Sequence, residues 1–317
     1  MAGDWTRREL TALLAAGIAL GPAAASAQPE ETPEAADSPP TEVALARASS
    51  LQVTAPVLIN GQGPYQFIID TGASASCLSA RVAGALQLPA GPAVRLNTLV
   101  GVRSRSSVIL DRLQIGDRVR RRVRAPVLSF TGFEADGVLG IDWLKGQRLV
   151  LGFSDSKMEI TRSKADRSQE GQVVVPARRR MGQLTIVDAD LSGERISAIL
   201  DSGSEVSLAN SSLRSLVRQR DPSSAKGDPV AMISIAGENF SGDGGFLPFL
   251  RLGGLQLGNV PVVYSDSHVF KLWDLEDSPA ILIGMDLLRQ FETVHLDFGR
   301  SAVRFDFTDK QKAANRA

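Results

Sequence analysis

The stretches FIIDTGAS (residues 67–74) and AILDSGSE (residues 198–205) repeat one pattern 131 residues apart. In each, an apolar run typical of a β-strand ends on an aspartate, which is followed by a hydroxyl residue and a glycine. The glycine lets the backbone bend sharply and approach a neighbouring segment closely. A single turn of this kind is common in hairpins and calcium-binding loops. Its meaning therefore depends on whether the surrounding sequence is repeated as well.

The repeat extends over most of the chain. The segment DGVLGIDWL (136–144) matches AILIGMDLL (280–288), and LQIG, ending at Gly116, matches LQLG, ending at Gly258. The first aspartate precedes the glycine of the later motif by 70 residues, and the second by 83. We therefore expect an all-β, bilobal fold of two homologous closed β lobes with a cleft between them. The N-terminal lobe is predicted at 51–164 and the C-terminal lobe at 165–317.

A pseudo-two-fold axis between such lobes would bring Asp70 and Asp201 together. Two carboxyls in contact cannot both ionise cheaply, so one of them keeps its proton over a wide pH range. The charged member can take a proton from water, and the neutral member can give one to a substrate carbonyl oxygen. This pattern favours general acid–base hydrolysis of peptide bonds.

The repeated motifs resemble those of the aspartic proteases of the pepsin and retroviral type. The signature of that family is Asp-Thr/Ser-Gly, followed later in each lobe by two apolar residues and a glycine, here 138–140 and 282–284. The resemblance covers most of residues 51–307. It implies that Asp70 and Asp201 are the catalytic pair. It also implies that Thr71 and Ser202 form a hydrogen-bond lattice between the two loops.

The resemblance assigns roles to the glycines too, because Gly72 and Gly203 would permit the close approach of the loops. The residue after the second glycine is Ser204, whereas the first lobe has alanine there. A serine hydroxyl bonded to the adjacent carboxylate would favour its charged form. On this basis Asp201 is predicted to ionise first while Asp70 holds the proton.

Two segments match the flaps that cover substrate in this family: 96–107, with Gly101 near its tip, and 232–245, with Gly237. Two flaps and two short lobes indicate a fused pseudo-dimer of retroviral style, so we expect a monomer. A polypeptide substrate would lie extended in the cleft and pair with the flap strands.

Other polar residues have simpler interpretations. Asp142 and Asp286 follow the second motif of each lobe and are predicted to cap short helices. The single cysteine, Cys77, is predicted to be a small buried side chain. With one cysteine and two histidines, neither a metal site nor a cofactor is expected. A formal net charge of zero gives no support for a nucleic-acid partner.

Residues 1–27 have the pattern of an export signal. Arg7 and Arg8 precede an apolar stretch at 10–23, and Ala25-Ser26-Ala27 fits a signal peptidase site. The apolar stretch is short for a membrane span, although an uncleaved anchor and a twin-arginine signal remain open alternatives. We expect an exported protein of the bacterial periplasm or cell envelope. Residues 28–50 are predicted to be a disordered linker.

Two functions fit these features. The first is an aspartic endopeptidase that cleaves an envelope protein through water activated by the two aspartates. The alternative is a catalytically silent module of the same fold that binds peptides. The intact Asp-Thr-Gly and Asp-Ser-Gly motifs favour the enzyme. The sequence gives no indication of the cleavage specificity or of the working pH.

Overall fold

The computed structural model describes residues 12–14, 19–20, 40–47, 51–130, 133–165, 169–180 and 182–314. Most of the predicted signal peptide (1–27) and the first part of the predicted linker lie outside the described residues. From the predicted signal peptide, the structure describes strands β1 (Ala12–Leu14) and β2 (Ala19–Leu20). No described helix is long and apolar enough to cross a membrane.

The first lobe is a closed β-barrel. Its six strands are β5 (Val53–Ile59), β6 (Gln62–Ile69), β7 (Cys77–Ser79), β9 (Val102–Ile115), β10 (Arg118–Leu128) and β11 (Gly137–Leu139). Pairing of β5 with β9 closes the ring. Strand β8 (Ala90–Asn97) extends the long β9 as a hairpin, and helices α1 (Ala80–Ala85) and η2 (Ile141–Trp143) cover the ends.

The second lobe repeats this architecture. Its barrel consists of β15 (Gln183–Leu191), β16 (Glu194–Leu200), β17 (Leu208–Ala209), β19 (Asn239–Leu252), β20 (Leu255–Tyr264) and β21 (Ala280–Ile283), closed by β15 with β19. Strand β18 (Pro229–Ser234) pairs with β19 as β8 does with β9. The helices are α2 (Ser211–Arg220), α3 (His268–Leu272) and α4 (Met285–Leu288). The predicted bilobal all-β fold is therefore confirmed.

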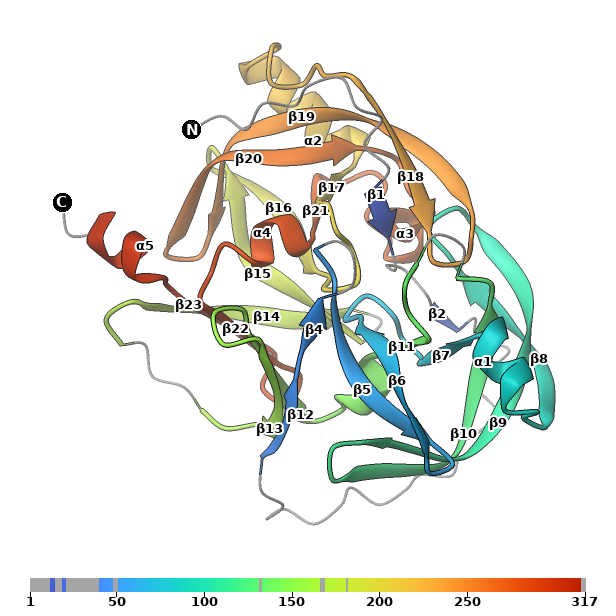
Figure 1. The fold of residues 1–317 in the computed structure, drawn as a ribbon. Coiled ribbons are helices and arrows are strands. Elements are labelled where there is room, and N and C mark those ends of the chain that lie inside the picture. The colour runs from blue at the N-terminus through green and yellow to red at the C-terminus, as the bar shows by residue number, and fades with distance from the viewer. Residues whose placement is uncertain are drawn as a thin grey trace.

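A sheet shared by the two lobes joins them (Figure 1). Its strand order is β14 (Gln172–Arg180), β23 (Ala302–Asp306), β22 (Thr293–Asp297), β12 (Gln147–Gly152), β13 (Lys157–Arg162) and β3 (Thr41–Ala44). Strands β12 and β22 pair in antiparallel fashion, so the end of lobe one is hydrogen-bonded to the end of lobe two. This joint holds the two barrels in one arrangement and fixes the cleft between them.

The shared sheet corrects one prediction. Strands β3 and β4 (Ala46–Arg47) fall inside the stretch 28–50 that the sequence predicted to be a disordered linker. Thr41 and Val43 are 3% and 7% exposed and alternate with exposed neighbours, so β3 buries one face against the sheet. The ordered body thus includes residues 40–47, because β13 offers them an edge to pair with.

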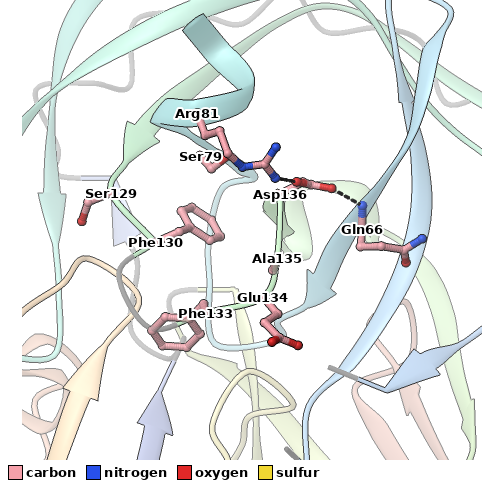
Figure 2. A pocket seen from close by; sticks show the side chains of 9 residues that line it. All are labelled: Gln66, Ser79, Arg81, Ser129, Phe130, Phe133, Glu134, Ala135 and Asp136. Carbon is pink, nitrogen blue, oxygen red and sulfur yellow. Dashed lines mark hydrogen bonds and ion pairs between the residues drawn. The ribbon is translucent and has the colours of Figure 1, made fainter. Parts of the chain in front are cut away.

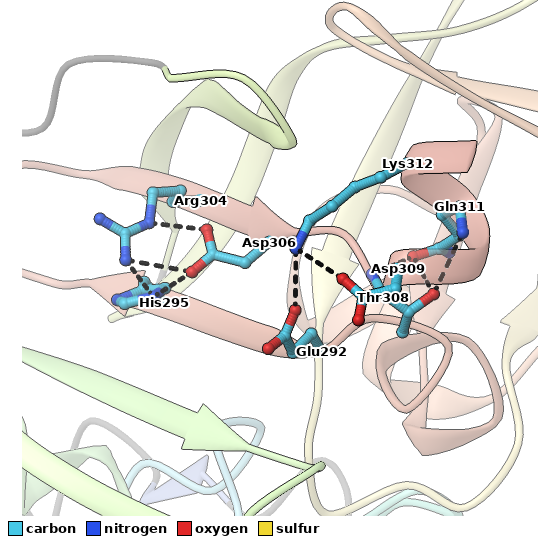
Figure 3. A network of polar contacts seen from close by, with 8 residues as sticks. All are labelled: Glu292, His295, Arg304, Asp306, Thr308, Asp309, Gln311 and Lys312. Atoms are coloured by element: carbon cyan, nitrogen blue, oxygen red, sulfur yellow. Dashed lines mark hydrogen bonds and ion pairs between the residues drawn. The ribbon is translucent and has the colours of Figure 1, made fainter. Parts of the chain in front are cut away.

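A polar network fastens the chain after β23 to this sheet (Figure 3). Asp306 pairs with Arg304 at 2.9 Å (Nε to Oδ1) and lies 3.0 Å from His295 (Nε2 to Oδ2). Beyond it, Lys312 on helix α5 (Asp309–Ala314) approaches Glu292 at 3.3 Å. The network ties α5 back to the loop before β22.

Candidate active site

The two repeated aspartates stand at matching strand ends. Asp70 follows β6 and Asp201 follows β16, and their side chains are buried, at 1% and 0% exposed. The Asp70 N–H donates to Leu139 O at 3.0 Å, and the Asp201 N–H donates to Ile283 O at 2.9 Å. The strand of the second motif therefore holds the turn of the first motif in each lobe.

The carboxyl groups present different oxygens to the protein and to the cleft. Oδ1 of Asp70 accepts the N–H groups of Gly72 and Ala73 at 2.8 Å, and Oδ1 of Asp201 accepts the N–H of Gly203 at 2.8 Å. Neither Oδ2 receives a hydrogen bond from an N–H or O–H donor among the described residues. The buried Oδ2 atoms are therefore available to share a proton and to hold a water molecule.

Thr71 and Ser202 lock the two loops together by reciprocal hydrogen bonds. Thr71 Oγ1 donates to Leu200 O at 3.0 Å and accepts the Ser202 N–H at 3.0 Å. Ser202 Oγ donates to Ile69 O at 2.8 Å and accepts the Thr71 N–H at 3.2 Å. Each hydroxyl thus acts both as donor and as acceptor across the pseudo-two-fold axis, which is the lattice that the family resemblance implied.

The glycines of the two motifs allow this close approach. A Cβ atom added at Gly72 would lie 2.6 Å from Asp201 Cγ, and one added at Gly203 would lie 2.5 Å from both carboxylate oxygens of Asp70. Real Cβ atoms essentially never come so near another atom. Each aspartate therefore packs directly on the glycine of the opposite loop.

The predicted helix-capping role of Asp142 and Asp286 is wrong. The N-caps of η2 and α4 are Gly140 and Gly284, and neither provides a side-chain cap. Instead, Asp142 Oδ1 accepts the Ser76 hydroxyl at 2.9 Å, and Asp286 Oδ1 accepts the Ser207 hydroxyl at 2.7 Å. The carboxylates reach back to the segments that leave the two aspartate loops, which are nearer than the free N–H groups of such short helices.

Burial also raises the pKa of both of these supporting carboxyls, to about 6 for Asp286. The two serines extend the contact, since the N–H groups of Gly140 and Gly284 donate to Ser76 Oγ and Ser207 Oγ at 3.1 and 3.0 Å. Each lobe thus braces its aspartate loop against its second motif through a serine and a carboxylate.

A second pair of cross-lobe contacts was missed by sequence reasoning. Gln52 Nε2 donates to Gly203 O at 2.7 Å, and Gln183 Nε2 donates to Gly72 O at 3.0 Å. Both glutamines are 1% exposed. Each precedes the aspartate of its own lobe by 18 residues, so the repeat spacing was the signal that could have found them.

Burial raises the pKa of both aspartates. For Asp70, burial acts together with the neighbouring charge of Asp201 and a side-chain hydrogen bond to it, so its pKa lies well above the ordinary range. Burial raises the pKa of Asp201 to about 6, while the Gly203 N–H and the side chain of Asp70 lower it. Asp201 therefore ionises first, and Asp70 keeps the proton.

The reason that the sequence analysis gave for this order is wrong. The Ser204 hydroxyl does not reach Asp201, because Ser204 Oγ donates to Val206 O at 2.6 Å. A main-chain acceptor two residues away competes successfully for a serine hydroxyl in a turn. The Ser204 main-chain N–H, rather than its side chain, helps to lower the pKa of Asp201.

The predicted flap segments form two hairpins, β8–β9 and β18–β19, and their glycines lie in the tips. The Thr98 N–H donates to Gly101 O at 2.8 Å, and the Gly237 N–H donates to Ser234 O at 2.8 Å. Gly237 has a φ of +80°, which a glycine adopts without strain.

Each flap tip is anchored in the opposite lobe. Leu99 is 1% exposed and packs in an apolar cluster with Phe270 and Trp273 of lobe two. Its carbonyl oxygen accepts the Ser267 hydroxyl and the His268 N–H, both at 2.8 Å. The other tip places Ile235 and Ala236 in an apolar cluster of lobe one, with Phe130 and Leu96 among its members. The structure thus shows the flaps closed.

A cavity of about 500 Å³ lies on lobe one, away from the aspartates (Figure 2). An ion pair of Arg81 with Asp136 closes one side, and Phe130 and Phe133 form another. Among the described residues, no group of histidine, cysteine or acidic side chains is arranged to hold a metal ion. Cys77 is buried and unpaired, as predicted.

Two family models match the chain, one in each lobe. Residues 55–146 match the model described as gag-polyprotein putative aspartyl protease, and residues 187–287 match the model described as aspartyl protease. Each match includes the aspartate, hydroxyl residue and glycine of its lobe. No curated protein matches the chain at a significant level.

Proposed function

The chain belongs to the aspartyl protease family, with one retroviral-protease-like domain in each lobe, and on that premise we propose that it is an aspartic endopeptidase. The observation that carries the proposal is the pair of buried aspartates, Asp70 and Asp201, whose Oδ2 atoms face no protein donor among the described residues. Such a pair is poised to hold one proton and one negative charge.

The chemistry follows from this charge state. The carboxylate of Asp201 takes a proton from a water molecule as the water oxygen attacks the peptide carbonyl. The carboxyl of Asp70 gives its proton to the carbonyl oxygen, which becomes a hydroxyl of the tetrahedral intermediate. Collapse of this intermediate breaks the C–N bond, with a proton delivered to the leaving nitrogen. The reciprocal bonds of Thr71 and Ser202 keep both carboxyls in register throughout.

The substrate we propose is a polypeptide of the periplasm or cell envelope, bound extended between the lobes and paired with the flap strands β8 and β18. The export-signal pattern of residues 1–27 supports the compartment. The presence of both halves of the site in one chain supports a monomeric enzyme.

The test compares the parent chain with Asp70→Asn and Asp201→Asn variants. Each protein is folded at full length and then cut at an engineered site in the stretch 28–39, which reproduces signal removal. A diverse peptide library is incubated with each from acid to neutral pH, and the cuts are read by mass spectrometry. Cuts by the parent that vanish in both variants support the proposal. An uncut library, with all three proteins folded by circular dichroism, would overturn it in favour of a binding module.

A further inference from the structure

The outer edges of both flaps are already occupied in the structure by strands from the beginning of the chain. Strand β1 pairs in parallel with β18, and strand β2 pairs in antiparallel fashion with β8 (Figure 1 shows β1 beside β18). The registers are Ala12 with Met232, Leu13 with Ile233, Leu14 with Ser234, Ala19 with Asn97 and Leu20 with Leu96.

The paired positions on the two flaps are equivalent. Counted back from the tip glycines Gly101 and Gly237, Leu96 and Met232 each lie five residues away. Asn97 and Ile233 each lie four residues away. The two short strands therefore contact the same place on each of two hairpins that the pseudo-two-fold axis relates.

The directions of pairing carry more information. A two-fold axis reverses the direction of every strand that it relates, so β8 and β18 run in opposite senses. One chain that runs straight across the axis must then be parallel to one flap strand and antiparallel to the other. This combination is the one observed. The registers also agree, because Ala12 and Leu20 have the same midpoint in sequence, position 16, as Leu13 and Ala19.

We infer that the segment carrying β1 and β2 occupies the substrate position of the cleft and competes there with substrate. The inference rests on the proposed function for its consequence, since an occupied cleft keeps the protease inactive. Alanine and leucine are the residue types in the two described strands. The site therefore accepts an extended peptide of small and aliphatic residues.

The position of this segment couples activation to export. It lies before the predicted signal peptidase site at 25–27, so cleavage there would separate β1 and β2 from the rest of the chain. After cleavage, main-chain pairing alone would hold the segment, and loss of the covalent tether lowers its effective concentration at the flaps. The flap edges would then be free to pair with a substrate.

The experiment uses the Asp70→Asn chain, so that a segment in the cleft is not destroyed by proteolysis. The chain is folded at full length, cut at an engineered site in 28–39 and separated from the released segment. Hydrogen exchange of the amides in β8 and β18 is followed before and after the cut. A synthetic peptide with the sequence of residues 9–23 is then added back. The matched control peptide has proline at the positions of Leu13 and Leu20, because proline cannot donate to a β ladder.

Removal of the segment is expected to speed exchange at the edges of β8 and β18 at least ten-fold. The peptide should restore protection and the proline peptide should not. Unchanged exchange after removal would overturn the inference. In the chain with both aspartates, the cut is expected to raise the rate of library cleavage at least ten-fold. Exchange that responds without any proteolysis keeps the segment in the cleft and overturns the proposed enzyme. Proteolysis with unresponsive exchange does the reverse.

Discussion

Arg103 and Glu238, one from each flap, form an ion pair across the cleft with 2.9 Å between Nε and Oε1. The Arg103 side chain is 45% exposed, and that of Glu238 is 12% exposed. A partly exposed pair of this kind contributes about 1 kcal/mol or less. It therefore acts as a weak clasp on flaps that are already anchored by their tips.

Loss of this clasp should weaken substrate binding more than it slows the chemical step. We expect Arg103→Gln to raise KM about two- to five-fold, with kcat nearly unchanged, which corresponds to ~0.5–1 kcal/mol. The measurement is steady-state cleavage of a peptide from the library. Arg105→Gln is the control, because the Arg105 guanidinium donates to the neighbouring carbonyl of Ser104. An equal rise of KM in both variants would contradict the prediction.

The cross-lobe bonds of Gln52 and Gln183 give a second prediction. Gln52→Leu leaves the buried carbonyl of Gly203 without this donor, at a cost of about 1–3 kcal/mol, part of which appears as misplacement of Asp201. We expect kcat to fall about ten-fold while KM changes little. Gln183→Leu should act alike through Gly72. Gln256→Leu, at an exposed position, should leave both constants unchanged.

Gly203→Ala should abolish activity, because the added methyl group would overlap the Asp70 carboxyl. The matched control is Gly84→Ala in helix α1, where an added Cβ meets no atom within 4 Å. Alanine is a better helix former than glycine, so this control should be active and more stable by about 0.5–1 kcal/mol. Cleavage assays and thermal unfolding of both variants provide the comparison. A Gly203→Ala enzyme of normal activity would contradict the packing described above.

The pH dependence of cleavage follows from the pKa values of the pair. Burial raises the pKa of Asp201 to about 6, so below that pH both carboxyls are protonated and no base is available. We expect kcat/KM to rise as the pH increases through about 6, and to fall at higher pH when Asp70 loses its proton. Ser204→Ala should leave the rising limb unmoved, because the Ser204 hydroxyl bonds to Val206. A rising limb near pH 4 would contradict this reading.

The same carboxyl predicts a dependence of stability on pH. Burial raises the pKa of Asp201 from 3.8 to about 6, so between these values the folded state binds more protons than the unfolded state. Stability contributed by this group is present below pH 3.8 and is lost as the pH rises through 6. Asp201→Asn should therefore raise the free energy of unfolding at pH 8 by up to about 3 kcal/mol, and by little at pH 4.

Asp221 provides a control of opposite sign. Hydrogen bonds from the Ser223 and Ser224 hydroxyls lower the pKa of this exposed carboxyl to about 2. Its contribution is present above pH 3.8 and is lost as the pH falls through 2, so Asp221→Asn should lower stability at neutral pH. Urea unfolding at pH 4 and pH 8 measures both variants. Equal shifts at the two pH values for Asp201→Asn would refute the assigned pKa.

Much of the site could be predicted because it is encoded twice. The Asp-Thr/Ser-Gly turns, the later glycines and the flap tips recur at similar spacing, and a repeat of this length predicts lobes related by symmetry. Ser204 shows the limit of the same reasoning. Its neighbourhood was inferred from position alone, whereas the direction of its hydroxyl depends on which carbonyl group the turn brings nearest.

The sequence by itself determined that the chain has two β lobes and that Asp70 and Asp201 are paired, because local strand patterns and their repeat spacing are properties of the chain. Only the tertiary structure decided that β3 joins the shared sheet, that Gln52 and Gln183 cross between lobes, and that β1 and β2 lie on the flaps. Those contacts join residues far apart in the chain, and a short strand or a lone glutamine has no periodic signal. Its partner is chosen by whichever edge or carbonyl group the folded lobes leave unpaired.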